Sequence, residues 1–545
     1  MFGRIFIFIS LIALVLNAQD VDFNSSDLPI VIIDTHGNTI PDEPKITADM
    51  KIIDNDGRNY LTDTDYDYTG KIGIEIRGSS SQHFFPKKQY AVETRHEDGE
   101  NRNVSLMGFP KENDWILHAP YSDKTLMRNV LVYTLTRESG WYASRCKFCE
   151  LVKNDEYMGV YILMEKIKRD DDRVDISKLK PDEISGDDLT GGYVVKIDKF
   201  NGQYTDGWQS AYPAWPGSNR RIFYQYHEPK ENEIVEAQKQ YIQNKIHSFE
   251  TQMNSDYPLD YDNIINENSF LDYFLINELS KNVDGYRLST FLYKDKDSDD
   301  PLIYAGPVWD YNLAFGNANY HRGDETDDWM LDIFYSDPGF QSDEFHPPFW
   351  WRKLWNDPGF RKKAVDRWQE LRQTRFSTRH IFYMIDSLAL HLEEARQRNY
   401  QRWLDVLGHW IWPNPGGYQN RTTYQSEINY MKSWINARLD WIDENIDPGN
   451  LPVDIPKPEK YGGIYNYPNP FNPVTHIVFH PEHSGDVTIG IYNLRGELIE
   501  RITKKGVKPG RTSFLFDGTH LKSGIYLYQV NINGIVKSGK AVLIK

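Results

Sequence analysis

The spacing of apolar residues changes along this chain of 545 residues, and that change limits the folds it can adopt. Early runs alternate as strands do, and in Lys71–Arg77 every second residue is isoleucine. From residue 234 onward the pattern turns helical, with long amphipathic stretches at Trp350–Ile385 and Tyr424–Ile446. We therefore expect an α+β fold, in which a strand-rich part precedes a helix-rich part.

A stretch rich in proline and glycine, Asp447–Gly463, reads as a linker. Beyond it, short alternating runs are separated by turn signals, which predicts a small all-β, immunoglobulin-like sandwich of about seven strands. The expected organisation is a leader at 1–18, a main domain at 19–447, a linker at 448–463 and the sandwich at 464–545.

The N-terminus has the features of a secretory signal peptide. Arg4 precedes the apolar run Ile5–Leu16, and Ala18 ends a short segment suited to cleavage. The run is too short to cross a bilayer, and no other stretch has spanning length. We expect an exported, soluble protein that begins near Gln19 and has no transmembrane segment after cleavage.

Net charge and cysteine content argue against nucleic-acid binding, a zinc site and a redox function. The net charge of -17 argues against a nucleic-acid partner, which favours a basic surface. Cys146 and Cys149 are the only cysteines, and an exported chain permits a disulfide between them. A lone C-x-x-C cannot supply four zinc ligands, so a local disulfide or two buried thiols is favoured over a redox site.

Two aspartates frame a predicted β-hairpin in the segment 281–317. Asp284 precedes the hairpin, and Asp310 opens a D-Y-N-x-x-x-G turn after it. In phosphoryl transfer one carboxylate accepts the hydroxyl proton and another holds the metal on ATP. Asp310 and Asn312 could both offer oxygen ligands to Mg²⁺, or to Mn²⁺. The alternative is two turn aspartates that cap backbone amides.

A loop of small residues between two predicted strands is a candidate phosphate contact. Ser79 and Ser80 lie in this loop, and Lys87 and Lys88 follow it. Backbone N–H groups of such a loop can bind phosphate, and a lysine facing inward favours an anion. Neither GxGxxG nor GxxxxGK[ST] is present, and a plain hairpin with a solvated lysine is the alternative.

Two further charged residues are candidates for binding the nucleotide. Glu165 ends a predicted apolar strand and could pair with Lys88, as an acidic residue pairs with the ATP lysine of kinases. Arg128, on a predicted helix after Ser122-Asp123, could contact phosphate. An exposed carboxylate and a surface salt bridge are the respective alternatives.

Taken together, these segments resemble the CotH family, which comprises spore-coat and secreted proteins with an atypical protein-kinase fold. The resemblance covers roughly residues 28–446, in the family's order. The matching segments are LPIVIIDTHGNTIPDEPKI, IRGSSSQHFFPKKQY, DWILHAPYSDKTLMRN, GVYILMEKIKRDDDRVDI, GGYVVKIDK, KNVDGYRLSTFLYKD, GPVWDYNLAFGN and FWWRKLWNDPGFRKKAVDRWQELR.

The resemblance implies a two-lobed kinase-like domain that phosphorylates Ser or Thr of proteins with ATP and Mg²⁺. By position, Asp284 matches the acid of the catalytic loop and Asp310 the metal-binding acid of the W-D motif. Lys88, or Lys87, falls where the phosphate-contacting lysine is expected. Many members carry an acid where this chain has Asn312, whose carbonyl oxygen can still bind a metal with less charge.

The C-terminal segments resemble a second family, the type IX secretion sorting domain. The matching segments are YNYPNPFNPVTHIVF, IYNLRGELI, LKSGIYLYQV and KAVLIK. This resemblance implies recognition by type IX secretion machinery and export to the cell surface or outside the cell. An ordinary immunoglobulin-like or fibronectin-like module is the alternative.

Two rival functions stay open at the level of sequence. ATP is scarce outside cells, which favours a non-catalytic surface or polysaccharide-binding protein on a kinase-like scaffold. The helical part is rich in tryptophan, but its tryptophans lie in apolar runs and are expected in a core rather than on a sugar platform. A glycoside hydrolase would also use paired carboxylates, although no spacing supports it.

Overall fold

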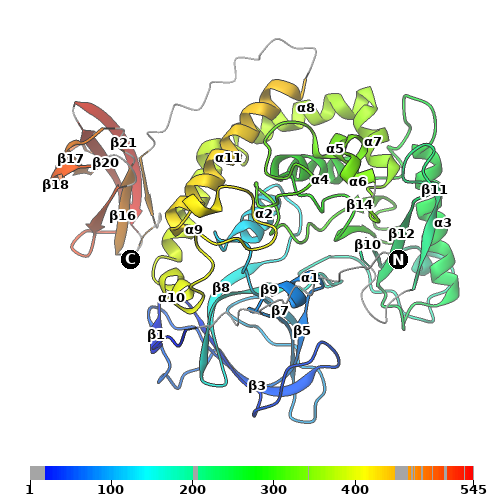
Figure 1. Cartoon of the computed structure of the whole chain (residues 1–545), viewed down its shortest axis with the longest axis horizontal. Helices are drawn as coiled ribbons and strands as arrows, with labels where there is room; N and C mark the ends of the chain where they lie inside the picture. Colours follow the sequence, from blue (N-terminus) through cyan, green and yellow to red (C-terminus); the bar gives the residue numbers. More distant parts are fainter. Residues whose placement is uncertain are drawn as a thin grey trace, which may run out of the picture. The chain divides into compact units, whose positions relative to one another are not determined.

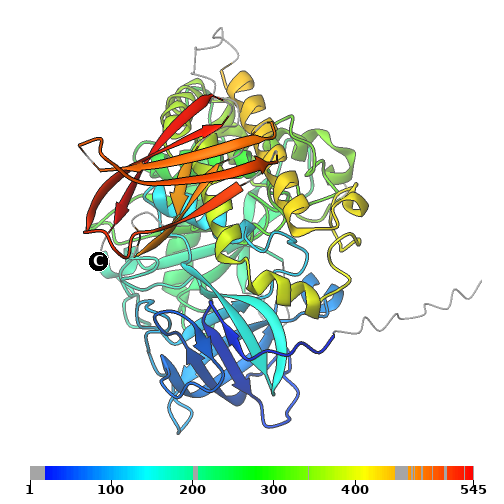
Figure 2. The same ribbon diagram turned by 90° about the vertical axis from the view of Figure 1, so that its left-hand side faces the viewer.

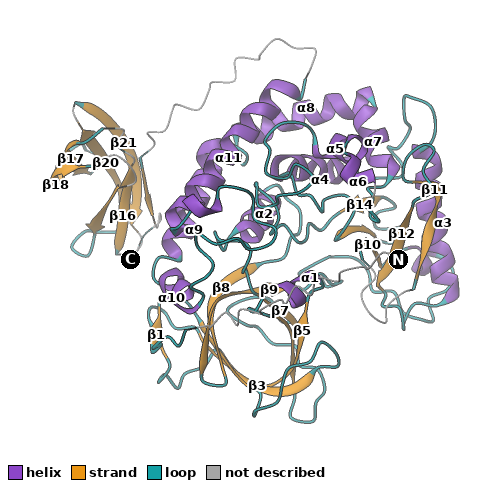
Figure 3. Ribbon diagram, viewed as in Figure 1, coloured by secondary structure: helices purple, strands orange, loops and turns teal. Residues whose placement is uncertain are grey.

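The computed structural model describes residues 19–199, 206–341, 343–447 and, with short gaps, 464–543. The predicted signal peptide and the predicted linker lie outside the described residues. The chain divides into two compact units: residues 1–376 with 384–448, and residues 377–383 with 449–545. Helices and several separate sheets make up the first unit (Figure 3), as expected for a mixed α/β chain.

A closed β-barrel forms the strand-rich part of the first unit (Figure 1). Neighbouring strands run antiparallel, except for the parallel pair β2 and β8 that closes the barrel. The strands, in order around the barrel, are β2 (Ile30–Asp34), β3 (Ile46–Ile53), β5 (Tyr68–Arg77), β6 (Gln89–Arg95), β7 (Asp114–His118), β9 (Glu156–Glu165) and β8 (Cys146–Lys153).

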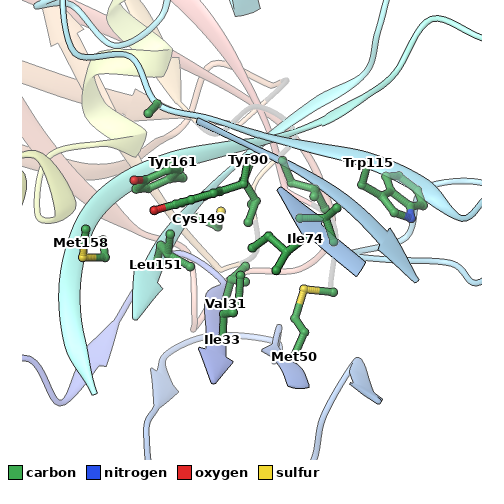
Figure 4. Close-up of a cluster of buried hydrophobic side chains, with 14 of the residues drawn as sticks. Val31, Ile33, Met50, Ile74, Tyr90, Trp115, Cys149, Leu151, Met158 and Tyr161 are labelled. Carbon is green, nitrogen blue, oxygen red and sulfur yellow. The ribbon is translucent and has the colours of Figure 1, made fainter. Parts of the chain in front are cut away.

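The barrel is filled by the apolar side chains that the alternating pattern places on one face (Figure 4). Ile74, Tyr90, Leu151 and Tyr161 are among those buried in its core. Each large apolar side chain buried in this way contributes roughly 1.5–3 kcal/mol relative to exposure. Tyr90 and Val92, which alternate along β6, both face this core.

The rest of the first unit combines a two-stranded sheet, β1 (Ser25–Ser26) with β4 (Asn59–Tyr60), a larger sheet and helices, and Figures 1 and 2 show the barrel at one end of it. The predicted hairpin is confirmed, because β13 and β14 pair antiparallel with Leu292 opposite Ala305. The strands of the larger sheet, in order, are β11 (Gly207–Pro213), β12 (Arg221–Glu228), β10 (Tyr193–Ile197), β13 (Thr290–Lys294) and β14 (Ile303–Ala305). Between residues 128 and 445 the helices are α2 (Arg128–Glu138), α3 (Glu236–Met253), α4 (Glu267–Ser280), α5 (Met330–Ser336), α6 (Pro338–Gln341), α7 (Phe349–Asn356), α8 (Pro358–Gln373), α9 (Thr378–His391), α10 (Ala395–Arg402) and α11 (Tyr424–Asn445). Residues 378–383 of α9 are assigned to the second unit.

Two local predictions need correction. The small-residue loop after β5 is partly helical, because α1 (Ser80–Phe84) forms one short turn there. Helix α2 begins at Arg128, later than its apolar pattern suggested. Asp123 still serves that helix, since its carboxylate accepts the Arg128 backbone N–H at 2.8 Å. Asp123 is buried, and its side chain spans the turn between residue 123 and the start of α2.

Cys149 and most of the tryptophans are core residues, whereas Cys146 is half-buried. Cys146 and Cys149 are separate thiols, and burial raises the pKa of each to about 12, which keeps them unreactive. Trp350 and Trp351 are fully buried, while Trp410 is 50% exposed. The prediction of a tryptophan-rich core therefore holds for the helical part, with Trp410 as an exception.

The second unit is all-β around its own apolar core, as the sequence predicted. A 3-stranded sheet and a 4-stranded sheet supply side chains to that core, including Ile489 and Phe516. The first sheet holds β15 (Tyr465–Tyr467), β16 (Val474–Phe479) and β19 (Thr512–Asp517). The second holds β18 (Leu498–Val507), β17 (Gly485–Tyr492), β20 (Gly524–Ile532) and β21 (Ile535–Leu543).

Candidate active site

The segment that follows β14, which we call the Asp310 turn (residues 309–317), has an unusual backbone. Asp310 adopts a φ of +61°, in the left-handed region that few residues other than glycine enter. Its N–H donates to the Tyr133 hydroxyl at 3.0 Å, and its carbonyl accepts from Asn282 at 3.2 Å. The next N–H, of Tyr311, donates to Asn129 Oδ1 at 2.6 Å. Strained residues held this firmly are often found at functional sites.

Helix α2 provides most of this support, and Arg128 is part of it. The Arg128 guanidinium donates to the Ala314 carbonyl at 2.9 Å and forms an ion pair with Asp123. Arg128 is 1% exposed, and its charge is paired with that of Asp123 inside the protein. Its predicted contact with phosphate stays untested, whereas its contact with the Asp310 turn is direct.

Asp284 lies in the turn between α4 and β13. Helix α4 ends where Lys281 takes a left-handed conformation, and this turns the chain toward Asp284. The Asp284 carboxylate accepts a hydrogen bond from Arg287 at 3.0 Å, and the same guanidinium binds Asp343 at 3.0 Å. The Asp284 side chain remains 18% exposed, so it is oriented by Arg287 yet open to solvent.

The structure brings Asp284 and Asp310 into one electrostatic environment. Burial, together with the carboxylates of Asp284 and Asp198, raises the pKa of Asp310 to about 6 against the opposing charges of Arg77 and Lys199. Burial also raises the pKa of Asp198, and the negative charge of Asp284 adds to this rise. Three acids from three separate segments, and an arginine from the end of β5, are therefore close enough to influence one another's charge.

Sequence reasoning missed Asp198. It follows the buried strand β10, and its Oδ1 accepts the Lys199 N–H at 2.8 Å. An acid directly after a buried strand was the available signal, but nothing in the sequence indicated that β10 lies beside the hairpin. The pairing of Val195 with Leu292 supplies that information.

The donors near Asp310 suit a hard cation that retains other ligands. Among the described residues, no group of three or more His, Cys, Asp or Glu side chains is arranged to hold a metal alone. Mg²⁺ usually binds one or two carboxylates together with phosphate oxygens and water, so a full protein cage is not required. The half-buried carboxylate of Asp310 fits such an ion. Asn312 lies in the same turn, and its backbone carbonyl accepts from Asn317 at 2.8 Å.

The two candidate lysines have different surroundings. The Lys88 ammonium donates to the carbonyls of Gln82 and Phe85 at 2.6 and 2.7 Å, at the C-terminal end of α1, the short helix that begins at Ser80. Burial lowers the pKa of Lys88. Lys88 thus shapes the serine-containing loop in this structure, while Ser79 is exposed beside it.

Lys87 joins the barrel to α10. Its ammonium is 1% exposed and donates to the Val160 carbonyl at 2.6 Å and to Asn399 Oδ1 at 2.8 Å. Burial lowers the pKa of Lys87 to about 7. These contacts link β9 to α10, so the role they support is structural.

The expected pair of Glu165 with Lys88 is wrong. The buried Glu165 carboxylate instead accepts from the Arg145 guanidinium at 2.6 Å and from the Arg145 N–H at 3.0 Å. Lys88 is engaged with backbone carbonyls at the other end of the neighbouring strands. Kinase analogy suggested the pair, but the barrel register places Glu165 opposite Trp115, away from the serine-containing loop.

Aromatic side chains border the segment that leads to Asp310. Trp309 stacks near Tyr133, with ring centroids 6.1 Å apart, and the Arg77 guanidinium lies 5.7 Å from the Trp309 ring. A small pocket next to this segment is lined by Tyr142, Tyr293 and neighbouring residues, including Val308. Planar side chains beside a carboxylate cluster are a suitable environment for a nucleobase next to its phosphates.

Comparison with protein families identifies the class to which this chain belongs. Residues 74–442 match the CotH kinase protein family, so the chain belongs to that family. Residues 466–545 match the secretion system C-terminal sorting domain. No curated protein matches the chain.

The sorting domain indicates export through type IX secretion to the cell surface or outside the cell. Within the part of the chain that the structure describes, no helix is long and apolar enough to cross a membrane.

Proposed function

We propose that this protein is a secreted protein kinase that transfers the γ-phosphoryl group of ATP to Ser or Thr of surface or extracellular proteins. The observation that carries the proposal is the electrostatic coupling of Asp284 and Asp310. These acids are 26 positions apart in sequence, and the charge of Asp284 helps to raise the pKa of Asp310. Membership of the CotH kinase protein family supports the same reading. The kinase-like, two-lobed description of residues 19–447 is part of this proposal.

The roles of the acids follow from their surroundings. Asp284, oriented by Arg287 and partly exposed, accepts the proton of the acceptor hydroxyl. Asp310, with Asn312 and the neighbouring Asp198, holds Mg²⁺ or Mn²⁺. When bound, the metal neutralises charge on the phosphates and orients them.

The positively charged and planar groups assist in binding ATP. Arg77 lies close enough to oppose the negative charge of Asp310, and it is placed to attract phosphate oxygens. The loop with Ser79 and Ser80 offers backbone N–H groups, and Lys88 maintains its shape. The stacked rings of Trp309 and Tyr133 provide a planar surface for the base.

Transfer of labelled phosphate tests the proposal. The purified full chain is incubated with labelled ATP, Mg²⁺ or Mn²⁺ and a mixture of surface proteins, beside Asp310→Asn. Asp299→Asn, an exposed acid at the hairpin tip, is the matched control. We expect transfer by the wild type and the control, with a loss of at least 100-fold in Asp310→Asn. If the wild type neither binds ATP nor transfers label, while it binds insoluble polysaccharide, the non-catalytic scaffold is correct.

A further inference from the structure

A line of hydrogen bonds joins the loop after β5 to the Asp310 turn. At the loop end, Gln89 Nε2 donates to Ser81 Oγ at 3.1 Å, and Gln89 Oε1 lies 2.7 Å from His118 Nδ1. At the other end, Asn129 Nδ2 lies 3.4 Å from His118 Nε2, and Asn129 Oδ1 accepts the Tyr311 N–H at 2.6 Å. We call these four side chains, Ser81 to Asn129, the relay.

The backbone at one end fixes the direction of every bond in the relay. A backbone N–H can only donate, so the Asn129 oxygen faces Tyr311 and the Asn129 NH₂ group faces His118. His118 Nε2 must then accept, which places its proton on Nδ1 and directs it to Gln89 Oε1. The Gln89 NH₂ group therefore donates to Ser81. All donors point from the Asp310 turn toward the loop.

This direction has two consequences. Ser81 Oγ is an acceptor in the relay, so its own hydrogen is left to donate elsewhere. A second proton on His118 would face the Asn129 NH₂ group, and burial followed by the charge of Arg77 lowers the pKa of His118 to about 3. His118 is 6% exposed and Asn129 is 3% exposed, so water does not replace these partners readily.

Close packing keeps Ser81 at this place. A Cβ at Gly78 would lie 2.2 Å from Ser81 Oγ, and Gly78 has a φ of +102° that other residues rarely adopt. The loop thus reserves room for the Ser81 hydroxyl. Ser81 lies in the same loop as the exposed Ser79, at the end of the strand that supplies Arg77.

We propose that the relay aligns the loop with the Asp310 turn, so that Ser81 donates its hydroxyl hydrogen to a phosphate oxygen of the nucleotide. The inference rests on the proposed kinase function and assigns Ser81 as a binding residue. His118, Gln89 and Asn129 are positioning residues, because they act through Ser81 at one end and through the Asp310 turn at the other. A displacement of the loop therefore alters the position of the Asp310 turn through these hydrogen bonds.

Binding of Mg²⁺·ATP by the full chain, measured by calorimetry, tests the inference. We expect Ser81→Ala and Gln89→Met each to raise Kd by roughly 10-fold, as for the loss of a hydrogen bond to a charged group. The double variant should bind no more weakly than the weaker single variant, since both remove one unit. His227→Phe is the control, because burial lowers the pKa of that histidine to about 3 as well, outside the relay.

A spectroscopic measurement tests the relay without activity. In protein labelled with ¹⁵N-histidine, and with His118→Phe to identify the signal, we expect a neutral ring protonated at Nδ1 at pH 7. A ring protonated at Nε2, or an imidazolium, overturns the relay, and so do Kd effects of the two variants that multiply or are absent. These results leave the kinase function standing, whereas a wild type that binds no ATP removes the kinase proposal and the Ser81 assignment together.

Discussion

At the scale of single residues, the charge of Asp310 is the feature with the clearest energetic consequence. Its pKa is raised from 3.8 to about 6, so the folded state binds the proton more tightly than the unfolded state does. Stability therefore falls as pH rises from about 4 to about 6, and the ionised carboxylate costs up to roughly 3 kcal/mol at neutral pH. A bound cation would remove that cost.

We expect Asp310→Asn to be more stable than the wild type at pH 7.5, by about 1–3 kcal/mol without metal. The advantage should vanish near pH 4, where the wild-type carboxyl is protonated. Mg²⁺ with nucleotide should raise the Tm of the wild type and not that of the variant. Scanning calorimetry at both pH values measures this, and a less stable variant at pH 7.5 would contradict the electrostatic account. Asp299→Asn serves again as the exposed control.

Variants of Glu165 test whether this residue stabilises the fold or contributes to nucleotide binding. Because its buried carboxylate is paired with Arg145, Glu165→Ala should destabilise the first unit by roughly 3–5 kcal/mol. Glu165→Gln should cost less, since it retains hydrogen bonding. Denaturant unfolding gives the free energy, and KM for ATP measured below the unfolding range should change less than 3-fold. A rise in KM for ATP at unchanged stability would instead favour the predicted cofactor role.

At the scale of elements, α2 acts as the support of the Asp310 turn. Tyr133, Asn129 and Arg128 lie on one helix and each contacts backbone groups of the turn. The apolar pattern predicted the helix, but the polar contacts on it were not predictable. They connect residues about 180 positions apart, which no local pattern encodes.

Tyr133→Phe tests this support. Removal of the hydroxyl leaves the Asp310 N–H without its acceptor, and the expected cost is about 1–3 kcal/mol in unfolding free energy. Because the left-handed Asp310 loses one of its restraints, the metal concentration for half-maximal transfer should rise several-fold. Metal titration of the transfer reaction measures the second effect. Tyr226→Phe is the matched control, because the Tyr226 hydroxyl accepts from the Gln243 side chain and does not contact the Asp310 turn in the described hydrogen bonds.

At the scale of the whole molecule, each of the two units has hydrophobic core residues of its own. The second unit carries the sorting domain, so export and the proposed catalysis are assigned to different parts of the chain. A core of its own is what allows a sorting domain to fold without the sequence that precedes it.

Loss of the sorting domain should change location and spare the proposed site. In a bacterium with type IX secretion, a chain that ends at residue 463 should accumulate inside the outer membrane, while the full chain reaches the surface or the medium. Immunoblots of fractionated cells measure the distribution. Equal surface display of both chains would show that residues 464–545 are dispensable for export.

The sequence by itself determined the types of element, their order, the all-β C-terminal unit and the acids at the two ends of the hairpin. These properties follow from local periodicity and turn chemistry, which the chain carries within short windows. Only the tertiary structure decided that Asp198 joins Asp284 and Asp310, that Glu165 pairs with Arg145, and that Arg128 holds the turn. Partners of buried charges are chosen by strand register and packing between distant segments, and that choice is made only when the whole chain folds.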